Sequence, residues 1–357
     1  MKLERAKQPG SPDNIGFAQH RHRKRGLLWL GAALAGLMLA GCAGSPSQFT
    51  PDSVPAQQIY QLFLVVGGIA AAVFVVVEGA LVYAVVRYGR KQKAGLPSQT
   101  EGNQRIEAAW TAAPAIVLVV VYVLSIQTLR SVTTLRTAAP GNAGGPLHVV
   151  VVGHQWWWEF DYPELNIVTA TELHVPVGVD VNLDVEAADV IHAFWVPQLG
   201  GQLDAVPGHV NQMWFQVSQA GTYHGVCAQF CGAEHAGMQF QVVAESPDQF
   251  QAWVKGQQAT PGAPTGNAAT GQAAFLAGAC VGCHTVAGTK ANGKVGPNLT
   301  HFASRQLFAG ALYPNTGGEV AFWLLNPQAM KPYNLMPNLH LPPDQINAIV
   351  TYLESLK

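Results

Sequence analysis

Charge is scarce in this sequence. The 357 residues include 20 Lys or Arg and 21 Asp or Glu, so charged residues make up 11% of the chain and the net charge is −1. Nucleic-acid-binding domains carry a basic excess, so we expect no nucleic acid partner. Cysteine is scarce too: there are five thiols, of which four could form two disulfides in an exported protein. Apolar residues are abundant instead, and they gather in three early runs.

The first apolar run, 27–41, follows the basic stretch 21–25. As a helix its fifteen residues would rise about 22 Å, short of the roughly 30 Å hydrocarbon core. We therefore predict a signal peptide over residues 1–41 rather than a span. The run ends in Leu39-Ala40-Gly41-Cys42, which resembles the bacterial lipoprotein box and implies a lipid on the Cys42 sulfur. An ordinary signal peptide or a short anchor is the alternative.

The other two runs are long enough to span a membrane. Residues 59–86 contain one charge, Glu78, and residues 108–129 contain none. The connection between them is basic, and the positive-inside rule places it in the cytoplasm and everything after residue 129 outside. We predict a transmembrane hairpin over 42–135 in a bacterial inner membrane, with the rest on the periplasmic face. Two spans form no transport pathway, so a larger membrane partner is expected. The loop charges are Arg87, Arg90, Lys91, Lys93 and Arg105 against Glu101 and Glu107.

The exported part divides into two domains. Short strand-like runs separated by turn residues predict an antiparallel sandwich or barrel over 136–255, closed by a helix that starts at Ser246-Pro247. Residues 256–270 are Gly, Pro, Ala, Thr and Gln with few others, which predicts a flexible linker. Residues 271–357 form a second domain that ends in an amphipathic helix over 343–356. The strand-like runs are 147–153, 169–185, 212–217 and 238–243.

Two thiols, an imidazole and a thioether lie within twelve residues as Cys227, Cys231, His235 and Met238. This soft ligand set suits copper, whereas a zinc site would use four Cys or His ligands. His192 offers a second imidazole. One mononuclear copper would need a single thiolate, and two thiolates in one loop can bridge two ions. A disulfide between the cysteines is the alternative in an exported protein.

Near its start the second domain contains Cys280-Val-Gly-Cys283-His284, the C-x-x-C-H motif of covalent haem attachment. Redox and zinc motifs share C-x-x-C, but an exported domain disfavours a cytosolic redox role. His or Met can supply the sixth iron ligand, and Met raises the potential. We favour Met336 because it lies just before the terminal helix, which is where class I cytochromes c, which this segment resembles, have their ligand. The weaker candidates are Met330, His301 and His340.

The copper motif, with the Val190-Ile-His192-x-Phe-Trp-Val-Pro197 segment before it, resembles the dinuclear CuA site of subunit II of a caa3-type cytochrome c oxidase. The resemblance covers about 59–255 and implies an all-β Greek-key cupredoxin domain. It implies that Cys227 and Cys231 bridge both coppers. His192 and Met238 then complete one copper, and His235 and the backbone carbonyl of Gln229 complete the other. The family usually has Glu at position 229, where the side chain also binds magnesium, so a normal magnesium site is doubtful here.

Two further segments resemble the same family. In Gly153-His-Gln-Trp156-Trp157 the resemblance implies that Trp156 lies at the surface over the copper site and receives electrons, while most neighbouring rings pack in the core. In Ile106-Glu107-Ala-Ala-Trp110 it implies that Glu107 marks the mouth of a proton pathway. The alternative for Glu107 is a carboxylate favoured by a helix N-terminus.

Residues 268–357 resemble a class I cytochrome c, which implies an all-α domain with one covalent haem c. The fold class expected is thus a multidomain membrane protein: a two-helix hairpin, a cupredoxin domain and a cytochrome c domain. The implied partners are oxidase subunits I and III and a soluble cytochrome c or similar donor. Electrons would pass from haem c to CuA and on to subunit I, where O2 is reduced with proton translocation. The alternatives are a CuA-containing nitric oxide reductase and a copper-delivery lipoprotein.

Overall fold

A computed structural model describes residues 47–89, 101–137 and 145–357 of the chain. The predicted signal peptide and Cys42 lie outside these residues, as do the loop cations Arg90, Lys91 and Lys93.

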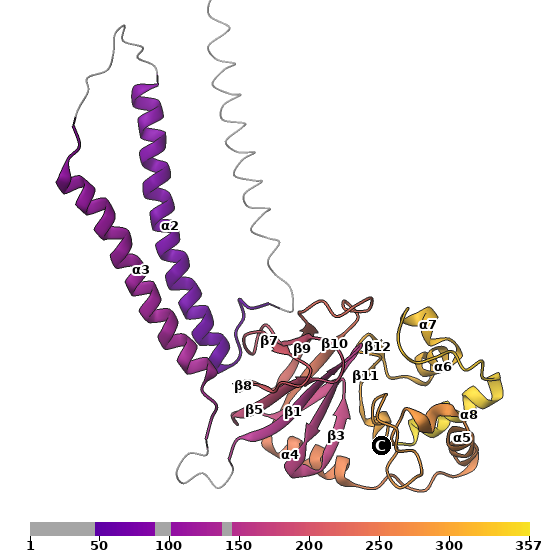
Figure 1. The fold of residues 1–357 in the computed structure, drawn as a ribbon. Helices are drawn as coiled ribbons and strands as arrows, with labels where there is room; N and C mark the ends of the chain where they lie inside the picture. Colours follow the sequence, from indigo (N-terminus) through magenta and orange to yellow (C-terminus); the bar gives the residue numbers. More distant parts are fainter. Residues whose placement is uncertain (1–46, 90–100, 138–144) are drawn as a thin grey trace, which may run out of the picture. The chain divides into compact units, whose positions relative to one another are not determined.

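Two long helices form the predicted hairpin, α2 (Val54–Tyr88) and α3 (Gln104–Thr133) (Figure 1). Both are long and apolar enough to cross a membrane, and their side chains are largely exposed, as lipid-facing helices require. Each helix begins at a capped residue. The Ser53 side chain accepts a hydrogen bond from the Ala56 amide, and the Asn103 side chain accepts from the amides of Arg105 and Ile106. The prediction of two spans is confirmed.

The residues just before α2 and just after α3 contact the domain that follows the hairpin. Ser53 forms a β-bridge with Val217, and the Asp52 amide donates to the Gln198 carbonyl over 2.8 Å. After α3, the guanidinium of Arg136 lies 3.7 Å above the ring of Trp214. The hairpin therefore holds this domain directly at the end where α2 begins and α3 ends.

The next domain is a sandwich of two five-stranded sheets, ordered β3-β2-β1-β5-β8 and β4-β10-β9-β6-β7. The predicted sandwich is correct, but the sheets are not purely antiparallel, because β1 pairs with β5 and β10 pairs with β4 in parallel. Both pairs join strands distant in sequence, which no tight hairpin can connect. The strands are β1 (Leu147–His154), β2 (Trp157–Tyr162), β3 (Ile167–Ala170), β4 (Glu172–Pro176), β5 (Val181–Ala187), β6 (His192–Trp195), β7 (Leu203–Ala205), β8 (Asn211–Phe215), β9 (Gly221–Cys227) and β10 (Gln239–Glu245).

Alternating side chains of these strands fill the space between the sheets. Trp158, Phe160 and Tyr162 of β2 are fully buried, while Glu159 and Asp161 between them point outward. A short 3-10 turn, η2 (Pro163–Leu165), follows β2. The predicted closing helix is α4 (Pro247–Gln258), which begins with a complete Ser246–Gln249 capping box and buries Phe250 and Val254.

The last domain is helical apart from two two-residue strands. On α8 the predicted apolar face is confirmed, since Ile346, Ile349, Val350 and Leu353 are all buried. The Phe275 ring of α5 meets the Tyr352 ring of α8 edge-on at 5.7 Å. The elements are α5 (Gly266–Ala277), η3 (Ala279–Gly282), η4 (Phe302–Ser304), β11 (Leu307–Phe308), β12 (Tyr313–Pro314), α6 (Gly317–Leu325), α7 (Pro327–Met330) and α8 (Pro343–Glu354).

The linker is shorter than the flexible stretch predicted for 256–270. Helix α4 continues to Gln258 and α5 begins at Gly266, so only 259–265 lie outside helices. The C-terminal end of α4 is also held by two side-chain hydrogen bonds. The Gln257 side chain donates to Ser304 over 3.0 Å, and the Gln258 side chain donates to the Leu165 carbonyl over 2.8 Å. A composition of small and polar residues does not prevent helix formation where neighbouring domains supply contacts.

Candidate metal and haem sites

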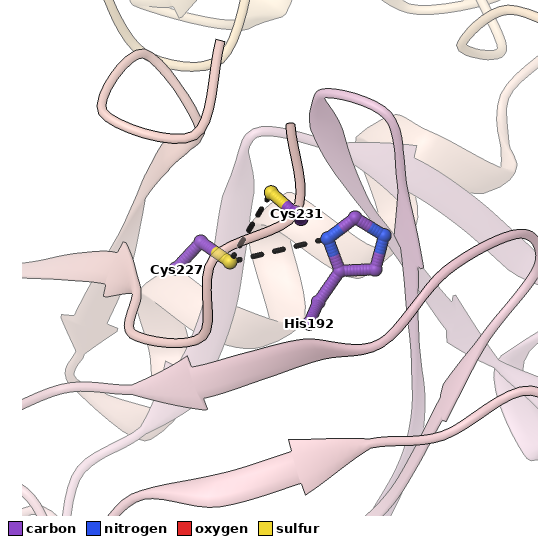
Figure 2. Close-up of side chains that lie close together, drawn as sticks. All are labelled: His192, Cys227 and Cys231. Carbon is purple, nitrogen blue, oxygen red and sulfur yellow. Dashed lines mark hydrogen bonds between the residues drawn. The ribbon is translucent and has the colours of Figure 1, made fainter. Parts of the chain in front are cut away.

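The two cysteines of the predicted copper motif lie side by side at one end of the sandwich. Cys227 ends β9, and Cys231 lies in the loop that leads to β10. Both are buried free thiols whose sulfurs are 3.8 Å apart (Figure 2). A disulfide requires about 2.05 Å, so the structure has no S–S bond here.

The other predicted donors gather on these two sulfurs. His192 is fully buried at the start of β6, and Figure 2 shows its ring turned toward the Cys227 sulfur. Its Nδ1 lies 3.9 Å from that sulfur. The Gln229 carbonyl lies 3.2 Å from the same sulfur. The Cys231 sulfur lies 3.6 Å from Nδ1 of His235 and 3.8 Å from the Met238 sulfur. All six groups named from the sequence therefore form one cluster.

The cluster fits copper by its chemistry and its spacing. The Cys227 and Cys231 sulfurs, 3.8 Å apart, would both be within reach of one metal ion, since a metal–thiolate bond is about 2.3 Å long. A hydrogen bond between the two thiols lowers the pKa of Cys227 and raises that of Cys231, because a second adjacent thiolate is unfavourable. A bound metal cation would stabilise two adjacent thiolates, so both cysteines would lose their protons when the metal binds.

Asp189 is a functional residue that the sequence did not single out. Its carboxylate lies 2.8 Å from Nε2 of His192 and accepts hydrogen bonds from the amides of Gln155 and Val190. Partial burial raises the pKa of Asp189, but these hydrogen bonds outweigh burial and hold it below its usual value. The charged carboxylate fixes the ring so that Nδ1 faces the thiols, as outer partners of metal-binding histidines do. Its signal in the sequence is an acid three residues before a ligand His.

We expect Asp189→Ala to weaken copper binding by about 10–100-fold, the usual effect of losing such a partner. The His192 ring would lose the carboxylate that orients it. Competition with a copper chelator, followed by copper content, measures the change. Asp248→Ala, at an exposed position of α4, is the control and should bind copper as the unmodified chain does. Equal chelator resistance in Asp189→Ala and the control would contradict this role.

Trp156 contacts the copper loop, as the resemblance implied. Its indole N–H donates to the Cys231 carbonyl over 3.1 Å, and the Gln155 side chain donates to the same carbonyl over 2.8 Å. The ring does not lie at the surface, however, because Trp156 is only 8% exposed. Residues of the helical domain cover this side of the loop, beginning with Lys331, which bonds to the Trp156 carbonyl.

The C-x-x-C-H segment forms a compact turn that suits covalent haem attachment. Cys280 lies in η3, and Cys283 follows directly as a half-buried free thiol. Nδ1 of His284 donates to the Pro297 carbonyl over 2.9 Å, which leaves Nε2 as the nitrogen for iron. Burial lowers the pKa of His284, which favours the neutral, ligating imidazole. A Cβ at Gly296 would lie 2.6 Å from this ring, so backbone packs directly against the imidazole.

Met336, the predicted axial ligand, is half-buried in the helical domain. It packs, with Cys280, against the core of the helical domain, and its sulfur accepts a hydrogen bond from the Trp323 indole over 3.0 Å. Of the weaker candidates, His301 is buried and His340 is exposed. Two thiols, a neutral imidazole and a held thioether fit a covalently bound haem.

Glu107 lies in the first turn of α3 and is exposed. The positive end of the helix dipole stabilises a carboxylate in this position. Glu78 lies within α2, also exposed.

The fold and the two sites define a membrane-anchored electron-transfer protein that combines a copper domain with a cytochrome c domain. Three family models agree with this class. The transmembrane domain of cytochrome c oxidase subunit II matches residues 48–128, its periplasmic domain matches 166–246, and cytochrome c matches 268–357. The chain belongs to the cytochrome c oxidase subunit II family. The subunit II domain implies copper, and the cytochrome c domain implies haem c.

Relatives in the family match almost the whole chain. Cytochrome c oxidase subunit 2 of Alkalihalophilus pseudofirmus is 35% identical over 90% of this chain and 94% of its own length. The protein of that name from Bacillus sp. strain PS3 is 35% identical over 90% and 94% of the two chains. The Bacillus subtilis protein is 33% identical over 91% and 96%. The similarity therefore includes the hairpin and both outer domains.

Proposed function

We propose that this chain is the electron-input subunit of a haem-copper oxidase that reduces O2 to water and translocates protons. Electrons from a soluble cytochrome c or similar donor enter at the helical domain and leave from the copper domain to subunit I, with subunit III in the same complex. Haem c and copper supply reversible one-electron storage. The observation that carries this proposal is that both donor sets occur in one chain, on two domains in direct contact.

We assign the copper cluster to a dinuclear CuA centre. Two thiolates are more than a mononuclear site needs, and the remaining donors divide evenly between them. One imidazole lies near each sulfur, His192 at Cys227 and His235 at Cys231, so each of two coppers would have a histidine. The Met238 sulfur and the Gln229 carbonyl, which also lie beside these sulfurs, would complete the two sites. The donors come from inflexible surroundings, since Met238 and His192 are fully buried. A rigid, filled donor set serves electron transfer rather than binding of O2. Gln229 offers no side-chain carboxylate for magnesium.

Electrons leave from the side of the copper domain that carries exposed apolar residues. Phe230, between Gln229 and Cys231, is 75% exposed, and its ring meets His235 edge-on. Val190 and Ile191, just before His192, are 38% and 45% exposed. Exposed apolar side chains beside buried ligands are typical of a protein interface. Subunit I is the partner that this surface fits.

The outer domains lie on the periplasmic face of a bacterial inner membrane. The basic loop between the helices supports this orientation, and Arg87 at the end of α2 belongs to it. Glu107, in the first turn of α3, is then on the cytoplasmic side, where it can deliver protons. The mature chain begins at a lipid-bearing Cys42 in this proposal. Its intact mass should exceed that of residues 42–357 by a diacylglyceryl group or more, and a mature chain with another start and a free amine would contradict it.

The reaction class is tested with the purified complex. We expect donor-driven consumption of O2 to exceed consumption of nitric oxide, because a terminal oxidase is the proposed assembly. Both rates are measured with electrodes in the same preparation. A complex that turns over nitric oxide but not O2 would replace the oxidase with a nitric oxide reductase.

A further inference from the structure

Lys331 connects the two outer domains through a buried ammonium. It follows α7 in the helical domain and is only 3% exposed. Its Nζ donates to the carbonyls of Trp156 over 2.8 Å, Gly237 over 2.9 Å and Ala309 over 3.0 Å. An ammonium has three N–H donors, so every donor is used. Two of the three acceptors belong to the copper domain.

These acceptors lie directly beside the copper ligands. Gly237 precedes Met238, and the Trp156 ring is bonded to the Cys231 carbonyl. Burial lowers the pKa of Lys331 to about 8, so at neutral pH the side chain still carries its proton and its three hydrogen bonds. In the part of the chain that the structure describes, Lys331 forms no salt bridge with a carboxylate. The ammonium is therefore satisfied by backbone carbonyls alone.

The backbone at Gly310, which lies beside the Lys331 ammonium, also contacts the copper domain directly. The Gln239 amide, at the start of β10, donates to the Gly310 carbonyl over 3.1 Å. Gly310 has a φ of +77°, and a Cβ there would lie 2.6 Å from the Gly237 carbonyl oxygen and 2.8 Å from Nζ of Lys331. Only glycine allows the two backbones to approach this closely.

A second buried polar contact joins the same two domains. Glu172 of β4 is 2% exposed, and its carboxylate accepts hydrogen bonds from the amides of Gln306 over 2.6 Å and Leu307 over 3.0 Å. The carboxylate is in the copper domain and the amides are in the helical domain. The two domains are thus joined at two places. At one the helical domain supplies the charged donor, and at the other the copper domain supplies the charged acceptor. Two separate contacts fix the orientation of the domains as well as the distance between them.

We propose that Lys331 is a positioning residue that keeps the haem domain docked on the Trp156 side of the copper site, so that electrons cross in one fixed arrangement. This inference rests on the proposed route from haem c to copper. A buried charge contributes orientation more than net binding energy, because its desolvation offsets much of the attraction. The arrangement also covers Trp156. A soluble donor therefore meets the haem domain, and the tether of 259–265 does not act as a free arm.

Hydrogen exchange of the full chain in its complex tests the docking without using electron transfer. In Lys331→Met the amides of Gln239, Gln306 and Leu307 should exchange roughly tenfold faster or more, because the Trp156 and Gly237 carbonyls lose their buried partner. Lys290→Met, at an exposed position of the same domain, should leave these amides unchanged. Amides of α8 report whether the domain is still folded. Gly310→Ala is a second variant with the same expected result, should Lys331→Met misfold. Unchanged protection of the three amides in a folded variant would overturn the docking.

Flash reduction of haem c then separates this inference from the proposed function. In the unmodified complex we expect haem c to pass its electron to copper at a rate that does not depend on solvent viscosity. In Lys331→Met the transfer should slow roughly tenfold or more and become viscosity-dependent, since docking must precede it. Equal, viscosity-independent rates in both would overturn the role of Lys331 alone. If haem c does not reduce copper in the unmodified complex, the proposed route itself is wrong.

Discussion

A chain with Cys280→Ala and Cys283→Ala together should carry no haem that survives denaturation. The two thiols are free and lie on one short turn beside His284, so both thioether bonds would be lost at once. Without them the haem is held by axial ligation only, and denaturation releases it. Peroxidase staining of a denaturing gel measures the covalent haem. Cys283→Ala alone should weaken or abolish the band.

The matched control for this experiment is His235→Asn, which alters the copper cluster and leaves the C-x-x-C-H turn intact. Its band should stain fully. Full staining of the double cysteine variant would show that the haem is not attached at this motif.

His235→Asn should break electron delivery at the other site. The variant removes an imidazole whose Nδ1 lies 3.6 Å from the Cys231 sulfur. The donor should still reduce haem c rapidly in a stopped-flow experiment. Arrival of electrons in subunit I should slow by roughly a hundredfold or more, since losing even an outer partner of a metal ligand costs about 10–100-fold.

His224→Asn is the control, because His224 is an exposed residue of β9 in the same domain. It should leave both phases unchanged. Reduction of subunit I at the unmodified rate in His235→Asn, with no copper bound, would mean that electrons bypass the copper site.

Local patterns allowed the sites to be predicted from the sequence. Cys227, Cys231, His235 and Met238 fall within one loop, and the short distances between them follow from that loop alone. Asp189 required the structure, because an acid three residues before a His has many common explanations. Four strands, β2, β6, β7 and β9, lie outside the predicted runs. In β9, Gly221 and Gly225 interrupt the apolar pattern. Strand β6 has only four residues, too few to show the alternation of apolar and polar side chains that indicates a strand.

The contact between the two outer domains has no signal in the sequence. Lys331 is a single cation far from Trp156 and Gly237 along the chain, and a lone Lys usually indicates a solvent-exposed position. Gly310 shows its function only when the opposing backbone is known. The composition of 256–270 even predicted free movement, although α4 and α5 extend into that stretch from both ends. Long-range docking depends on complementary surfaces, which local periodicity cannot reveal.

The most direct test of the route is the order of reduction in the intact complex. Donor is mixed rapidly with the oxidised enzyme, and haem c, copper and the haem of subunit I are followed separately by their absorbance. We predict that haem c is reduced first, that copper is reduced as haem c is reoxidised, and that subunit I follows. Reduction of copper ahead of haem c, or at an unchanged rate in the chain that lacks Cys280 and Cys283, would contradict the route from the haem domain through the copper site.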